Sequence, residues 1–202
     1  PKAIVVTNLF RDQLDRYGEV THALESIREG VKKTPESVLC LNADCSMTAS
    51  LAQGTDNPVV FFGVNEPLTA VMSPVAEAPR CIRCGAEYHY EYHTFDHLGG
   101  FFCPKCGYKR PEPDIAVTHV IDTTESHSIV EFSLRGTPAT ADIALPAAYN
   151  IYNAVAALTA AVTLGMDADK ALLSLGSVHS GFGRMETFDF DGAAVRMILV
   201  KN

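Results

Sequence analysis

The sequence predicts an α/β protein in which a mainly parallel sheet is flanked by helices and interrupted by a small inserted β-hairpin. Three observations support this fold class. Short β-branched runs alternate with segments of helical periodicity in the first third of the chain. Two C-x-x-C-G pairs then break that alternation. Hydrophobic residues make up 47% of the 202 residues and charged residues 20%, which is enough to bury a sizeable core.

The first third of the chain predicts strands that pair in parallel through right-handed crossovers. The expected elements are a buried strand at 3–7, a helix at 21–33, a strand at 37–41, a short helix at 46–52 and a buried strand at 58–64. The first helix is amphipathic, because Leu24, Ile27 and Val31 share one face.

Beyond residue 111 the pattern predicts three short strands, two helices and a closing hairpin. The expected elements are strands at 115–121, 128–134 and 139–145, helices at 147–164 and 168–175, and strands at 187–190 and 193–200. Asp167 precedes the second helix as an N-cap. The Asp191-Gly192 pair is typical of a tight hairpin turn.

Charge and hydropathy limit the possible partners and location. The formal charge of −8 argues against a surface that coats nucleic acid, although a phosphate pocket needs only a few local donors. No apolar run approaches the ~20 residues that span a bilayer, and residues 1–10 show no signal peptide, so we expect a cytoplasmic protein. Strand-like runs lie at both ends without flanking elements, and we therefore expect this sequence to be part of a longer polypeptide.

Four cysteines, Cys81, Cys84, Cys103 and Cys106, have the spacing of a tetrahedral metal site. Two residues between paired thiolates let one turn present both to an ion, and the glycine after each pair permits positive φ. The alternatives are two disulfides, unpaired core cysteines or rubredoxin-type iron. The C-x-x-C spacing favours a metal in a reducing compartment, and zinc is the expected ion. Four thiolates leave no open position for a substrate, so the zinc is expected to be structural.

We therefore divide the chain into a zinc-ribbon insertion at 79–111, called the ribbon below, and an α/β domain at 1–78 and 112–202. About thirty residues cannot fold without the stabilisation that a metal supplies. His89, His93 and His97 share one face of the expected hairpin but lie about 13 Å apart, which favours solvated histidines over a second metal site. Cys40 is expected to be a buried small hydrophobe.

Three further segments carry polar residues where a ligand would be bound. Asn8 follows the first strand, at the edge where open α/β sheets bind ligands, although an Asn cap with surface charges explains it as well. Asn150 and Asn153 share one face of an Ala-rich helix and suit a planar ligand, but capping and local bonding are equally open. Arg184 follows a glycine-rich turn that suits a phosphate, and such turns also occur without one.

Jointly and in this order, these segments resemble the central ATPase domain of the Mur ligases. That family has a T-N-x-x-x-D-H-L-D-x-x-G segment, an H-N-x-x-N-A helix start and an H-R-x-E turn. The inserted four-cysteine ribbon narrows the resemblance to the MurT branch, which the stretch N-L-F-R-D-Q-L-D-R-Y-G-E and the closing I-L-V-K-N also resemble. Gln13, Tyr149 and Gly183 stand where the peptide-forming relatives have histidine.

The resemblance implies that Asn8, Asn150 and Asn153 lie by ATP, with Asn153 near the base and Arg184 at the phosphates. It also implies Mg²⁺, and it assigns no catalytic residue within this chain. No G-x-x-x-x-G-K-[ST] loop occurs in these residues, and by resemblance that loop would precede Pro1. We therefore expect the chain on its own to be inactive and to bind ATP weakly.

By the same resemblance, the complete protein amidates the α-carboxylate of D-glutamate in the stem peptide of lipid II through an acyl-phosphate. Ammonia would come from glutamine through a glutaminase subunit, GatD. This amidation would take place at the inner face of a bacterial cell membrane, as a step of peptidoglycan synthesis. The alternative is a non-catalytic ribbon module that binds protein or nucleic acid, against which the negative charge and the long α/β framework stand.

Overall fold

The computed structural model describes residues 1–9, 20–68, 80–95, 97–145, 147–178 and 184–198. Its first half contains β1 (Ala3–Val6), α2 (Val20–Lys32), β2 (Val38–Asn42), α3 (Ser46–Ala49), a 3-10 turn (Ser50–Ala52), β3 (Val59–Val64), β4 (His89–Phe95) and β5 (Leu98–Phe102). Its second half contains β6 (Ile115–Thr123), β7 (Ser128–Leu134), β8 (Thr137–Ile143), α4 (Ala148–Thr163), α5 (Ala168–Leu175), β9 (Arg184–Phe190) and β10 (Ala193–Ile198).

A six-stranded sheet organises the α/β part, in the order β1-β2-β3-β6-β7-β8. The pairs β1–β2, β2–β3 and β3–β6 are parallel, and β7 and β8 add to this sheet antiparallel. The predicted fold class, an α/β protein with a mainly parallel sheet, is confirmed. The antiparallel extension follows from short turns after β6 and β7, because a parallel return would need a crossover of a dozen residues or more.

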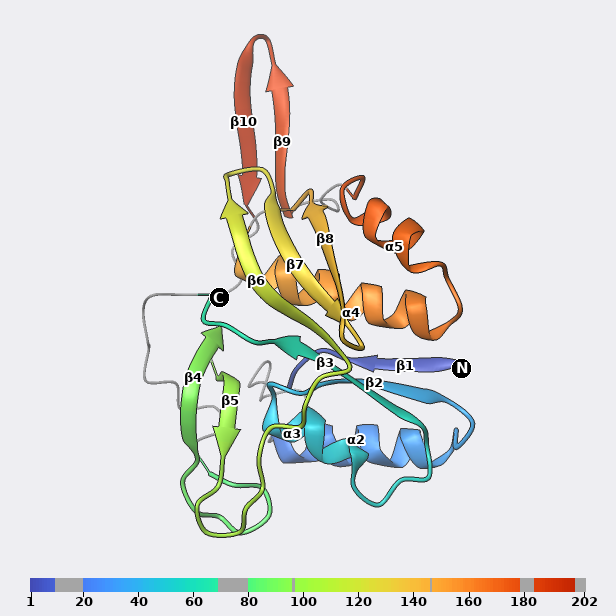
Figure 1. Ribbon diagram of the computed structural model, residues 1–202. Helices are drawn as coiled ribbons and strands as arrows, with labels where there is room; N and C mark the ends of the chain where they lie inside the picture. The colour runs from blue at the N-terminus through green and yellow to red at the C-terminus, as the bar shows by residue number, and fades with distance from the viewer. Residues whose placement is uncertain (10–19, 69–79, 96, 146, 179–183, 199–202) are drawn as a thin grey trace.

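Helices cover both faces of the parallel strands (Figure 1). α4 packs against β1, β2, β3 and β6, and α2 lies across the opposite face. Alanines let the backbone of α4 approach the strands closely, and Val155 and Leu158 fill the space between them. The predicted N-cap of α5 is confirmed, because Asp167 Oδ1 accepts a hydrogen bond from the Lys170 amide at 3.0 Å.

The last two strands form the predicted hairpin, which extends away from the six-stranded sheet (Figure 1). Asp191 and Gly192 both have positive φ, 55° and 80°, as a two-residue primed turn requires. Among the described residues, no helix is both long enough and apolar enough to cross a membrane.

The ribbon leaves the sheet after β3 and returns at β6, although β3 and β6 are neighbours in the sheet. Its β4 and β5 pair with each other in a separate antiparallel sheet. An insertion of this kind does not disturb the parallel order, because the strands on either side of it still pair directly. The boundary at 79 stays a prediction, since residues 69–79 lie outside the described residues.

Candidate functional site

Two matched turns present the four cysteines of the ribbon. The Gly85 amide donates to the Cys81 carbonyl at 2.8 Å, and the Gly107 amide donates to the Cys103 carbonyl at 3.0 Å. Both glycines have the positive φ that their position after each pair predicts, 71° for Gly85 and 72° for Gly107. Each turn therefore points two thiols to the same side of the backbone.

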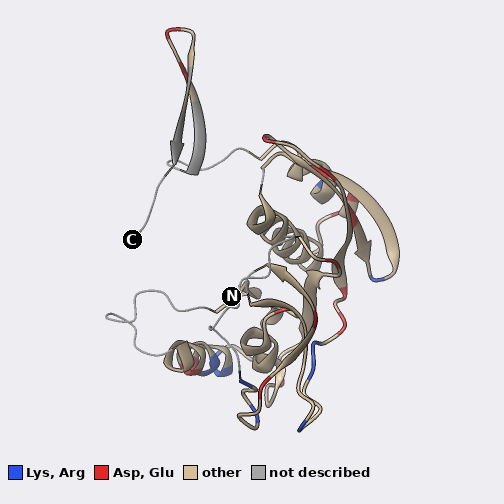
Figure 2. Ribbon diagram, turned by 90° about the vertical axis from the view of Figure 1, so that its left-hand side faces the viewer, with Lys and Arg blue, Asp and Glu red and all other residues tan. Residues whose placement is uncertain are grey.

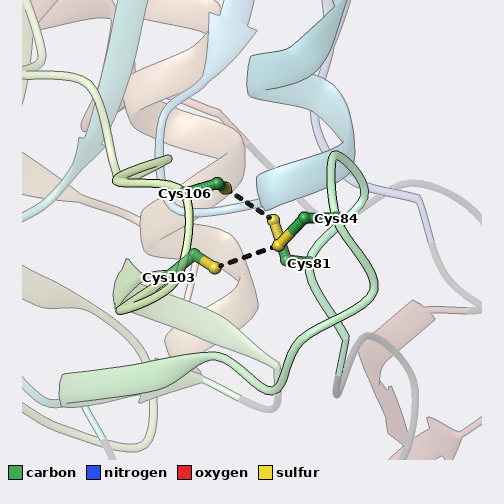
Figure 3. Close-up of side chains that lie close together, drawn as sticks. All are labelled: Cys81, Cys84, Cys103 and Cys106. Atoms are coloured by element: carbon green, nitrogen blue, oxygen red, sulfur yellow. Dashed lines mark hydrogen bonds between the residues drawn. The ribbon is translucent and has the colours of Figure 1, made fainter.

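The four sulfur atoms lie within 4.8 Å of one another (Figure 3). Cys81 Sγ is 3.5 Å from Cys106 Sγ, and Cys84 Sγ is 3.5 Å from Cys103 Sγ. A disulfide needs about 2.05 Å, whereas sulfurs that surround one zinc ion at 2.3 Å in a tetrahedron lie about 3.8 Å apart. The donor set and its spacing form a site that can hold a metal ion.

The charges at this cluster also favour a cation. Burial raises the pKa of Cys103, but backbone amides of Cys106 and Lys105 outweigh it and lower the pKa to about 6. At Cys106 the Tyr108 amide lowers the pKa, yet burial and the neighbouring thiols raise it to about 12. Four thiolates at this distance therefore require a positive ion among them.

A small aromatic core fixes the ribbon to the α/β part. Tyr88, Phe101 and Tyr108 pack edge-on or tilted against one another, and this group also contacts Ala49 of α3 and Phe61 of β3. Tyr108 donates its hydroxyl to the Ser46 carbonyl at 2.7 Å. The ribbon therefore shares packing and a hydrogen bond with the domain into which it is inserted.

A second link between the ribbon and the domain is a buried carboxylate at the end of β2. Asp44 Oδ1 accepts from Arg110 Nε at 2.6 Å, and Asp44 Oδ2 accepts from the Val64 amide at 2.8 Å and the Tyr152 hydroxyl at 2.6 Å. The Asp44 side chain is fully buried and that of Arg110 is 12% exposed. We call these four residues the Asp44 cluster.

The sequence patterns assign no role to Asp44, Arg110 or Tyr152. No local pattern identifies these partners, because they are 66 and 108 residues from Asp44. The one available signal was a charged residue directly after a buried strand, at the ligand-binding edge of a parallel sheet. Burial raises the pKa of Asp44, and the Arg110 charge and the hydrogen bonds oppose that rise.

His97 differs from the expectation of a solvated histidine. Its side chain is buried, with 3% exposure, and its Nε2 lies 3.9 Å from the Cys45 Sγ. The residue folds inward because the turn after β4 is tied to the domain by a hydrogen bond from the Gly99 amide to the Asp44 carbonyl. Cys40, by contrast, is fully buried as expected.

Two of the predicted nucleotide residues lie together on α4. Asn153 is exposed, and its amide nitrogen is 3.3 Å from Asn150 Oδ1. Asn150 lies within the first turn of α4 and is not its N-cap, which is Ala147. The two amides therefore form one polar face beside the buried Tyr152.

The structure places Asn8 and the backbone of Arg184, the other two predicted nucleotide residues. Asn8 is half-buried just beyond β1, where the Asn42 side chain donates to the Thr7 carbonyl at 2.7 Å and so joins the ends of β1 and β2. Arg184 begins β9, opposite Ile198. Its side chain, the glycine-rich turn at 181–183 and the charged segment at 10–19 lie outside the described residues.

An exposed ion pair lies beyond the end of β3. Glu66 Oε2 is 2.9 Å from His119 Nδ1, and its other oxygen accepts from the Val120 amide. The hydrogen bond to Glu66 and its charge raise the pKa of His119 above the ordinary value of about 6.5. A raised histidine pKa adds stability that is present at low pH and is lost as pH rises through the folded-state value.

Replacing Glu66 with glutamine is expected to lower the pKa of His119 towards its ordinary value, because the variant lacks the negative charge. Titration of the histidine ring signals by NMR measures this change directly. Midpoints of the other histidines serve as the internal control. An unchanged His119 midpoint in Glu66→Gln would show that the two side chains are not paired in solution.

Comparisons with known proteins agree with the observed fold. No family model matches the chain. A curated relative from Streptococcus pneumoniae, the MurT subunit of lipid II isoglutaminyl synthase, is 32% identical over 204 residues that cover the whole chain and 44% of the relative. The same subunit from Staphylococcus aureus strain COL is 28% identical with the same coverage. The chain thus spans less than half the length of these relatives.

Solved structures show the same fold. A pseudomurein peptide ligase type C from Methanothermus fervidus has a TM-score of 0.80 and 26% identity, and the match covers the whole chain and 39% of that protein. MurF from Acinetobacter baumannii has a TM-score of 0.65 and 12% identity over 98% of this chain and 33% of its own. Sequence identity along the full chain and the shared fold agree: this chain is similar over its whole length to MurT subunits and has the fold of the Mur ligases.

Proposed function

We propose that this chain is the larger part of the ATPase domain in a lipid II isoglutaminyl synthase. The observation that carries the proposal is the match of the whole chain to MurT of Streptococcus pneumoniae. The polar residues at the carboxyl ends of the parallel strands support it, because open α/β sheets bind ligands at that edge. The Asn150–Asn153 face on α4 supplies planar amides of the kind that recognise a base.

In the proposed reaction, ATP phosphorylates the D-glutamate α-carboxylate of the lipid II stem peptide, and ammonia displaces phosphate to give D-isoglutamine. The acyl-phosphate step replaces a poor leaving group with a good one. Mg²⁺, when bound, would neutralise charge on the transferred phosphoryl group. The ammonia source is a glutaminase subunit, GatD, and the setting is the inner face of a bacterial cell membrane.

The four cysteines of the ribbon, Cys81, Cys84, Cys103 and Cys106, are proposed to hold a structural zinc ion. The sulfur spacing described above fits a tetrahedral site, and the four sulfur atoms are close enough together for one ion to contact all of them. A site closed by four thiolates has no place for a substrate. The ion is therefore proposed to stabilise the ribbon at 79–111 and to take no part in the amidation.

The nucleotide assignment predicts different effects for two substitutions in the full-length protein with its glutaminase partner. Asn153→Ala removes an amide that contacts the base, so ATP affinity is expected to fall roughly tenfold, about the effect of one hydrogen bond. Arg184→Ala removes a charge at the phosphates and is expected to lower kcat by roughly 10²-fold, with a smaller effect on KM. Steady-state kinetics at varied ATP measures both effects.

Ser174→Ala is a matched control, because Ser174 is an exposed polar residue on the neighbouring helix α5, where its hydroxyl donates to the Lys170 carbonyl at 2.8 Å. It is expected to leave the KM for ATP within about twofold of the wild type. Wild-type kinetics in both Asn153→Ala and Arg184→Ala would remove these residues from the nucleotide site. Failure of the complete complex to consume ATP with lipid II would reject the proposed function itself.

A ribbon module that binds nucleic acid or protein is the second candidate. Figure 2 shows the described Lys and Arg residues in small separate groups, on α2, on the ribbon and at single turns. The formal charge of −8 also argues against the continuous basic face that phosphate-backbone binding requires. The amidating ligase remains the function that the site supports best.

A further inference from the structure

The ribbon and the Asn150–Asn153 face are joined by one buried carboxylate. Arg110 lies four residues beyond the last cysteine of the ribbon and binds Asp44 Oδ1. Tyr152 lies between Asn150 and Asn153 in the sequence and binds Asp44 Oδ2. The same side chain therefore determines both where the ribbon ends and where the first turns of α4 lie.

The geometry leaves this carboxylate little freedom. Its two oxygens receive three hydrogen bonds, from Arg110, Tyr152 and the Val64 amide, and the side chain is fully buried. A buried carboxylate that loses one of these partners lacks a hydrogen bond and a counter-charge, which costs free energy. Displacement of Arg110 is therefore expected to move Asp44. Tyr152 moves with Asp44, because Tyr152 is buried, with 6% exposure, and its hydroxyl lies 2.6 Å from Asp44 Oδ2.

Gly63 of the neighbouring strand β3 leaves space for the contact between Asp44 and Arg110. A β-carbon at Gly63 would lie 2.6 Å from Asp44 Oδ1 and 2.8 Å from Arg110 Nη2. Both distances are too short, so any side chain larger than hydrogen would push the ion pair apart. Glycine inside a β-strand weakens the strand, and the space it leaves here is occupied by the ion pair.

We propose that Asp44 and Tyr152 are positioning residues that transmit the state of the ribbon to the nucleotide face of α4. When the ribbon holds its metal, Arg110 is held at Asp44 and Tyr152 holds Asn150 and Asn153 in their binding positions. When the ribbon is released, that constraint on α4 is lost and nucleotide affinity falls. This inference rests on the proposed function, because it takes the Asn150–Asn153 face as the nucleotide site.

The test measures ATP affinity by titration calorimetry on the full-length protein, with and without prior removal of zinc by a chelator. In the wild type, removing the metal is expected to weaken ATP binding by about fivefold or more, the lower end of typical coupling between sites. In Tyr152→Phe, the zinc-loaded protein is expected to bind ATP more weakly from the start. Metal removal should then change its affinity by less than about twofold, because the connection is already broken.

Gly63→Ala tests the same link without removing metal. The added methyl group separates Asp44 from Arg110 while all four cysteines remain, so zinc content should stay at one per chain and ATP affinity should fall. Tyr90→Phe is the matched control, because it removes a ribbon hydroxyl that donates to the His97 carbonyl and does not touch Asp44. This control is expected to behave like the wild type in both titrations.

The outcomes separate the coupling from the proposed function. Equal loss of affinity on metal removal in the wild type and in Tyr152→Phe overturns the coupling, as does unchanged affinity in Gly63→Ala. In either case ATP still binds and the proposed function stands. A zinc-loaded wild type that binds no ATP overturns both, because the nucleotide face would then be wrongly assigned.

Discussion

Replacing Cys103 with serine is expected to reduce the bound zinc from one per chain to nearly none. The substitution removes one of the four proposed ligands, and zinc binding at comparable structural sites contributes about 10–16 kcal/mol in zinc-finger peptides. Within the part of the chain that the structure describes, the metal-binding group contains Cys81, Cys84, Cys103 and Cys106 and no fifth cysteine that could replace Cys103. Elemental analysis of the purified protein measures the metal directly.

The same variant is expected to keep most of its helical circular dichroism but to unfold at a lower denaturant concentration. The ribbon contacts Ala49 and Phe61 of the domain, so its unfolding exposes apolar surface there without removing the six-stranded sheet. Cys40→Ala is the control, because this buried cysteine lies in β2, away from the cluster, and should leave zinc content unchanged. Full zinc content in Cys103→Ser would show that the four sulfurs do not act as one site.

Replacing Arg110 with methionine is expected to destabilise the protein by about 3–5 kcal/mol, the usual cost of removing one partner from a buried ion pair. Methionine keeps much of the side-chain volume but leaves the fully buried Asp44 without its counter-charge. Denaturant unfolding at neutral pH measures the change in the free energy of unfolding.

The stability lost in Arg110→Met is expected to be smaller at low pH. Burial already raises the pKa of Asp44, and removing the Arg110 charge raises it further, above the value in the unfolded chain. The protonated carboxyl carries no charge, so the destabilisation is expected to shrink as pH falls through the raised value. Asp44→Asn/Arg110→Met is the control and should be less destabilised than Arg110→Met alone. An Arg110→Met variant as stable as the wild type would mean that Asp44 is not charged in the native protein.

Features that depend on a few neighbouring residues could be predicted from the sequence. The two C-x-x-C-G pairs predicted both cysteine-presenting turns, because a glycine directly after each pair permits the positive φ observed at Gly85 and Gly107. Hydrophobic periodicity located α2, α4, α5 and the strands to within a few residues. Asp167 and the Asp191-Gly192 turn were identifiable for the same reason, since a cap or a tight turn depends on only three or four neighbouring residues.

The contacts that could not be predicted join residues that lie far apart in the chain. Asp44, Arg110 and Tyr152 belong to separate segments that the sheet order brings to one point, and each looks like an ordinary surface or helix residue in sequence. His97 became buried because the ribbon folds back onto the end of β2, a packing event without a local pattern. A residue's own neighbours set its backbone conformation, whereas its burial and its charge partner depend on the parallel sheet and the α4 packing, which exist only in the assembled fold.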